Sequence, residues 1–160
     1  MRRALAAAAL LLLAPAAAAQ DWALCDGLRP VFAAGPERFR ALRTEEVWTS
    51  AEVNRASITL PGFDSCYVDQ VTATFWCLAR PAERGAATAF GDSVRGRLDA
   101  CFPVLTRRSW DEEAEPGVRR FVSQWPLGGE RRLRLIERRR ADAGPGAVFL
   151  YVYWGAVRGG

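Results

Sequence analysis

The chain has 160 residues and a formal net charge of +4, and it contains neither histidine nor lysine, so all of its basic side chains are arginines. The absence of histidine excludes Ser-His-Asp and Cys-His catalysis and histidine metal sites, and the absence of lysine excludes P-loop and Schiff-base chemistry. Only carboxylates, hydroxyl groups and arginines remain as catalytic groups.

The first 19 residues have the pattern of a secretory signal peptide. Arg2 and Arg3 precede an apolar run over residues 4–13, and the small residues at 17–19 suit cleavage by a signal peptidase. We expect cleavage between Ala19 and Gln20, which leaves a mature chain of residues 20–160. No later apolar run is long enough for a transmembrane helix. The predicted location is therefore the periplasm or the extracellular space.

The first half of the mature chain predicts helices followed by strands. The apolar spacing favours a helix over residues 22–34, interrupted at Pro30, and Pro36 starts a short helix that reaches Leu42. The strands that follow are expected at residues 47–49, at 56–60 and, in a hairpin-like segment that reverses near Asp69-Gln70, at 66–78.

The second half predicts one long helix and three strands. The helix is expected over residues 82–101, between Pro81 and Pro103. The acidic stretch 111–117 is expected to form a surface loop. The strands are expected at residues 118–125, 131–138 and 147–154.

The two halves also resemble each other weakly. The similar segments are residues 42–48, 60–62 and 75–78 in the first half and residues 105–110, 125–128 and 148–151 in the second. The similarity is either chance or a repeat of one helix and about three strands. The predicted fold class is α+β: a two-layer sandwich in which a mainly antiparallel sheet of about six strands carries two main helices on one face. Residues 20–160 would form a single domain.

The four cysteines, an even number after an export signal, predict two disulfides, and the lack of a CxxC spacing argues against a redox or zinc site. Cys77 shares a strand face with Val71, Ala73 and Phe75, and Cys101 ends a helical stripe of Phe90, Val94 and Leu98. Because these two faces have to pack together, we predict a Cys77–Cys101 bond and, by elimination, a Cys25–Cys66 bond. The competing Cys66–Cys77 bond would need a turn near residues 71–72, where no typical turn residue stands.

Two strands, at residues 72–78 and 148–154, are apolar on both faces. Such strands are usually covered on both sides, whereas the predicted helices cover one side only. The second face, which carries Trp76, is therefore either covered by loops or the N-terminal segment, or open to a partner protein, a glycan or a second copy of the chain.

Arginine clusters recur in the second half of the chain. Within residues 131–138, Arg132 and Arg134 alternate with leucines, which predicts a strand with one buried and one cationic face. The cationic face could bind an anionic partner such as lipid headgroups, a cell-wall polymer or an acidic protein. Alternatively, it is a solvated face whose arginines pair with Glu130, Glu137 and the acidic stretch. Export and the small net charge argue against nucleic acid.

These features predict a small exported envelope protein that binds another protein or an envelope polymer, as an inhibitor, an immunity-type protein or an accessory factor. We expect no catalysis, cofactor or metal. The candidate partner-binding residues are Arg132, Arg134 and Trp76, and a homodimer through the open sheet face is a further possible assembly. One alternative is a structural envelope component, and another is a carboxylate-dependent cell-wall hydrolase. The acids available to such a hydrolase are Asp64, Asp69, Glu45, Glu46, Glu112 and Glu113.

Overall fold

The computed structural model describes residues 15–48, 52–83, 85–140 and 146–155, and most of the predicted signal peptide lies outside them. Helix α1 is longer than predicted and begins at Pro15. The elements are α1 (Pro15–Ala34), the short 3-10 helices η1 (Gly35–Glu37) and η2 (Arg40–Leu42), β1 (Arg43–Trp48), β2 (Val53–Ala56), β3 (Ser65–Asp69), β4 (Thr74–Ala79), α2 (Ala86–Cys101), β5 (Arg108–Glu115), β6 (Val118–Pro126), β7 (Arg132–Arg140) and β8 (Ala147–Tyr153).

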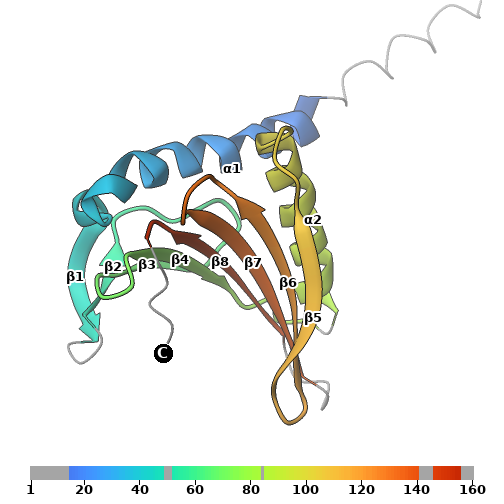
Figure 1. Ribbon diagram of the computed structural model, residues 1–160. Helices are drawn as coiled ribbons and strands as arrows, with labels where there is room; N and C mark the ends of the chain where they lie inside the picture. Colours follow the sequence, from blue (N-terminus) through green and yellow to red (C-terminus); the bar gives the residue numbers. More distant parts are fainter. Residues whose placement is uncertain (1–14, 49–51, 84, 141–145, 156–160) are drawn as a thin grey trace, which may run out of the picture.

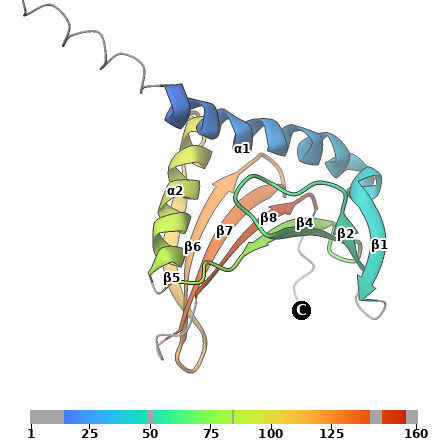
Figure 2. The ribbon, with the colours of Figure 1, turned by 180° about the vertical axis from the view of Figure 1, so that it is seen from behind.

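The strands form one curved, antiparallel sheet in the order β1-β2-β3-β4-β8-β7-β6-β5. Both helices lie on the same side of it: α1 spans the sheet (Figures 1 and 2), and the end of α2 meets α1 at Cys25 and Phe32. The α+β class is confirmed, but the described sheet has eight strands instead of about six. Most of the acidic stretch predicted as a loop belongs to strand β5. A strand with few apolar residues gives no alternating pattern to detect.

Each half of the described chain is one main helix followed by four strands, not about three. The two halves meet where β4 pairs with β8, in the middle of the sheet. There Cys77 lies opposite Leu150, and on either side Trp76 faces Tyr151 and Leu78 faces Phe149. When residues 75–78 are aligned with residues 148–151, exchanging the two segments leaves these strand pairs unchanged. Two related halves around a twofold axis require this symmetry.

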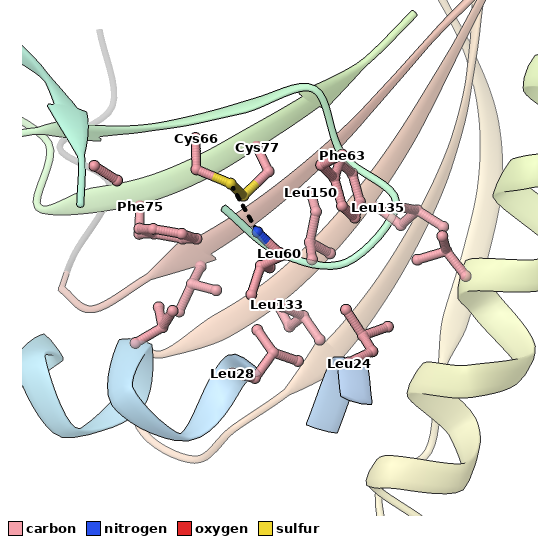
Figure 3. Packing of buried hydrophobic residues seen from close by; sticks show 14 of the residues in the cluster. Leu24, Leu28, Leu60, Phe63, Cys66, Phe75, Cys77, Leu133, Leu135 and Leu150 are labelled. Carbon is pink, nitrogen blue, oxygen red and sulfur yellow. Dashed lines mark hydrogen bonds between the residues drawn. A yellow bond between two sulfur atoms is a disulfide. The ribbon is translucent and has the colours of Figure 1, made fainter. Parts of the chain in front are cut away.

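The core fills the space between the helices and the sheet. Leu24 and Leu28 of α1 point toward Leu133 and Leu150 of the sheet, and Leu60 from the β2–β3 connection lies between them (Figure 3). All five side chains are at most 1% exposed. The strand residues in this layer alternate with residues that point away from the helices, so the sheet has a second face of its own.

The predicted disulfide pairing is wrong, because the bonds are Cys25–Cys101 and Cys66–Cys77. Cys66 and Cys77 lie directly opposite each other in the β3–β4 hairpin (Figure 3). Its turn forms without a typical turn residue at 71–72, since Asp69 Oδ1 accepts a hydrogen bond from the Thr72 amide and Ala73 takes a positive φ of 48°.

Cys101 is the last residue of α2, and it bonds to Cys25 of α1 instead of Cys77. Two helix predictions also need correction. Pro30 does not interrupt α1, which continues to Ala34, and its side chain is exposed. Helix α2 begins at Ala86 instead of residue 82, after Gly85 with a left-handed φ of 78°.

Candidate partner-binding face

The side chains that point away from both helices form what we call the open face. None of the described helices lies on it, and it carries all three candidate residues, Trp76 on β4 and Arg132 and Arg134 on β7. One row of directly opposed positions crosses five strands from β3 to β6. It consists of Tyr67, Trp76, Tyr151, Arg134 and Gln124. The strand register thus brings the predicted tryptophan and one of the predicted arginines into the same row.

The centre of the open face is a continuous layer of aromatic rings. Tyr67 stacks on Trp76 with their ring centroids 4.4 Å apart, and Trp76 stacks on Tyr151 at 6.3 Å. Tyr151 in turn lies 5.7 Å from Tyr153 and 6.0 Å from Phe149, with nearly parallel rings. Aromatic pairs at these separations attract one another beyond the burial of their surface, so the rings stabilise one another.

Two arginines border this layer on the side of β7. The guanidinium carbons of Arg132 and Arg134 lie 5.3 Å and 5.7 Å from the centre of the Tyr153 ring. Arg134 also lies 5.7 Å from the Trp110 ring and donates from Nε to Gln124 Oε1 at 2.6 Å. Within the described part of the chain neither arginine forms an ion pair. Their charges meet aromatic rings and an amide, not a carboxylate.

Other arginines of the same clusters do find acidic partners. Arg138 pairs with Glu115 at 3.2 Å, Arg120 approaches Glu112 at 3.9 Å, and Arg139 pairs with Glu137 at 2.8 Å. For Arg120 and Arg138 the solvated, ion-paired interpretation of the clusters holds, whereas the partner of Arg139, Glu137, is buried. The register of β5 against β6 decides the difference, because it sets the acidic strand beside Arg119 and Arg120 and away from Arg132 and Arg134.

Parts of the open face are buried. Leu78 and Val122 point to this side of the sheet but are only 6% and 1% exposed. A cavity of about 200 Å³ lies elsewhere, beside the Cys25–Cys101 bond where the helices meet. Its lining residues are Trp22, Cys25, Arg29, Phe32, Cys101 and Phe102.

Burial changes the acidity of two tyrosines in the aromatic layer. It raises the pKa of Tyr151 to about 12, and the nearby Tyr153 adds to the shift. Burial also raises the pKa of Tyr153, although the positive charges of Arg134 and Arg132 oppose this shift. Both hydroxyl groups therefore stay protonated at neutral pH and can donate hydrogen bonds to an acceptor-rich partner.

The candidate acids for a hydrolase do not converge. Asp64 accepts a hydrogen bond from the Arg80 amide and Asp69 one from the Thr72 amide, at opposite ends of β3. Glu112 lies on β5, at the edge of the sheet, and accepts a hydrogen bond from Trp110 Nε1. The side chains of Glu45 and Glu46 lie outside the described part. The hydrogen bonds of Asp64, Asp69 and Glu112 each stabilise the loop or strand to which the acid belongs.

Sequence reasoning missed a buried ionic network on the helix side of the sheet. Glu137 on β7 is fully buried and pairs with Arg95 of α2 and with Arg139, and both arginines lie over the Phe121 ring. The available signal was a glutamate at a core position of the alternating 131–138 pattern. Gly91 leaves space for Glu137, because a Cβ atom there would lie 2.4 Å from Glu137 Oε1.

No known protein family, no curated protein and no solved structure matches the chain. Among the described residues no group of acidic or cysteine side chains has the arrangement of a metal site. None of the described helices is long and apolar enough to cross a membrane.

Proposed function

We propose that the protein is an exported binding module whose open face docks onto an acidic surface of another envelope protein. The observation that carries this proposal is the pair Arg132 and Arg134, which lie over Tyr153 beside the aromatic layer and have no carboxylate partner among the described residues. An acidic partner would supply the missing charges.

The composition of the open face supports a protein as the partner. The large side chains of its aromatic layer are half-buried, so part of each remains accessible to a partner. Tyrosine, tryptophan and arginine are the residues that most often dominate the binding energy of protein interfaces. The open face combines these three residue types in one layer of neighbouring rings and guanidinium groups.

The electrostatic part of the proposal predicts how binding responds to salt. Arg132 and Arg134 are both partly exposed, so their attraction to an acidic partner is screened as ionic strength rises. The protonated hydroxyl groups of Tyr151 and Tyr153 add uncharged donors that salt does not screen. We therefore expect binding that weakens with salt, without being abolished by it.

The proposal can be tested with a deca-glutamate peptide as the acidic probe. We expect the purified protein to bind the peptide, and the double variant Arg132→Glu/Arg134→Glu to lose binding by at least about tenfold. Both substitutions remove contacts with Tyr153, and the second also removes those with Trp110 and Gln124, so circular dichroism and urea unfolding must show that the variant is folded before its binding is compared.

The matched control is the double variant Arg29→Glu/Arg97→Glu, which changes the net charge equally but on the two helices, across the sheet from the open face. It should keep the affinity of the parent protein. Equal loss in both double variants would show attraction by net charge alone and contradict a docking face. Tighter binding to a polyuronate than to the peptide would point to an anionic envelope polymer instead of a protein.

A further inference from the structure

The outer edge of β5 suggests how two copies of the chain can assemble. β5 is the last strand of the sheet and spans eight residues, so a row of backbone amide and carbonyl groups has no neighbouring strand in the described part. Such an edge can accept another strand. Most of its side chains are exposed.

Symmetry limits how β5 could pair with its own copy. In an antiparallel pair, residues directly opposite each other point to the same face of the sheet, and the direction alternates from one pair to the next. When a twofold axis relates the two strands, one residue must therefore lie on the axis, opposite the same residue of the second copy. Each choice of central residue therefore defines one register. The charges along the strand can then be compared between registers.

Five of these registers place acids against acids. A centre at Asp111, Glu112, Glu113 or Glu115 puts that residue opposite itself, and a centre at Ala114 puts Glu113 opposite Glu115. A centre at Arg108 puts this arginine opposite its own copy. Like charges directly opposite each other destabilise a strand pair. These registers are therefore unfavourable.

The register centred on Trp110 has no acid–acid pair. It sets Arg108 opposite Glu112 of the second copy, twice by symmetry, and places the two Trp110 rings together on the axis. Ser109 then faces Asp111. A centre at Ser109 also avoids acid–acid pairs, but it sets Arg108 opposite Trp110 and uses only the beginning of the strand. Charge complementarity thus selects a single register.

We propose that the protein forms a homodimer by antiparallel pairing of β5 with β5 of a second copy, centred on Trp110. The two sheets become one continuous sheet, and the two open faces lie on the same side of it. Arg108 is available for this pairing, since within the described chain it faces Gln124 and has no ion pair.

Charge reversal tests the register. Sedimentation of the purified protein should show a dimer whose dissociation constant rises at least about tenfold in Arg108→Glu and in Glu112→Arg, because each variant opposes like charges at both symmetric pairs. The double variant Arg108→Glu/Glu112→Arg should restore the dimer. Mixing the two single variants should give a heterodimer, in which both pairs are again opposite in sign.

A cysteine on the axis tests the same register independently. Trp110→Cys should cross-link to its own copy under mild oxidation, whereas Ser109→Cys should not, since its copy would lie farther away than a disulfide can span. Circular dichroism checks that each variant is folded. A parent protein that stays monomeric at millimolar concentration overturns the proposal. A dimer that survives Arg108→Glu but dissociates in Arg132→Glu/Arg134→Glu also overturns it, in favour of pairing through the open face.

Discussion

The glycine beneath the buried ionic network offers a sharp test of the structure. Gly91 lies on the face of α2 that packs on β7, and a Cβ atom there would lie 2.4 Å from Oε1, 2.5 Å from Cδ and 2.7 Å from Cγ of Glu137. Real Cβ atoms essentially never approach other atoms this closely. In Gly91→Ala, Glu137 would have to move, although it is fully buried and held by Arg95 and Arg139.

The expected cost follows from two opposing effects. Inserting a methyl group into a packed core costs about 1–3 kcal/mol, and disturbing a buried ion pair adds to this cost. Alanine in place of glycine returns about 1 kcal/mol of helix propensity. We expect Gly91→Ala to lower the free energy of unfolding by about 2 kcal/mol, measured by urea unfolding followed through tryptophan fluorescence.

The same helix supplies the matched control. Gly96 has no atom near the position of a Cβ, so Gly96→Ala should raise the free energy of unfolding by up to about 1 kcal/mol. In a Glu137→Ala background, Gly91→Ala should lose most of its cost, because the clashing atoms are gone. Equal stabilisation by both glycine substitutions would refute the packing of α2 on β7 described above.

Three further predictions concern covalent structure and pH. Peptide mapping without reduction should return a Cys66–Cys77 bond, and since this bond closes a loop of 11 residues its removal should cost about 3 kcal/mol; a map linking Cys77 to the end of α2 would contradict the hairpin. Because the pKa of Tyr151 is raised in the folded state, the contribution of its protonated hydroxyl group to the free energy of unfolding is complete below pH 10. This contribution declines between pH 10 and about 12, by about 1.4 kcal/mol per pH unit. Tyr151→Phe should flatten this alkaline loss in urea unfolding, and an unchanged slope would disprove the assignment. The exported protein should begin at Gln20 on N-terminal sequencing, and an intact N-terminus would disprove the predicted cleavage.

Periodicity in the sequence predicted the α+β class and the alternation of β7, whose leucines are buried while Arg132 and Arg134 point to the other face. It could not predict β5. That strand lies at the edge of the sheet and is exposed on both sides, so no apolar residue repeats along it. Its charged residues predicted a loop, although its backbone pairs with β6 from Arg108 to Glu113 and again at Glu115.

The disulfide pairing failed for a different reason. Cys77 and the α2 stripe do face one core, as predicted, but sharing a core does not fix which cysteines come within bonding distance. The hairpin turn depends on the Asp69 side chain and on an unusual φ at Ala73, and neither is evident from composition. Likewise, the strand register decides which arginines meet carboxylates, and register cannot be read from a single strand.

The central claim, that the open face binds an acidic partner, is tested most directly by the indole N–H signals of the tryptophans in an NMR titration with deca-glutamate. Trp76 and Trp110 belong to the open face, whereas Trp22 lies exposed on α1 and Trp125 is buried, with its Nε1 donating to Asp99 at 2.9 Å. The account predicts that the peptide shifts the Trp76 and Trp110 signals and leaves those of Trp22 and Trp125 in place. A shift at Trp22 with none at Trp76 and Trp110 would contradict it.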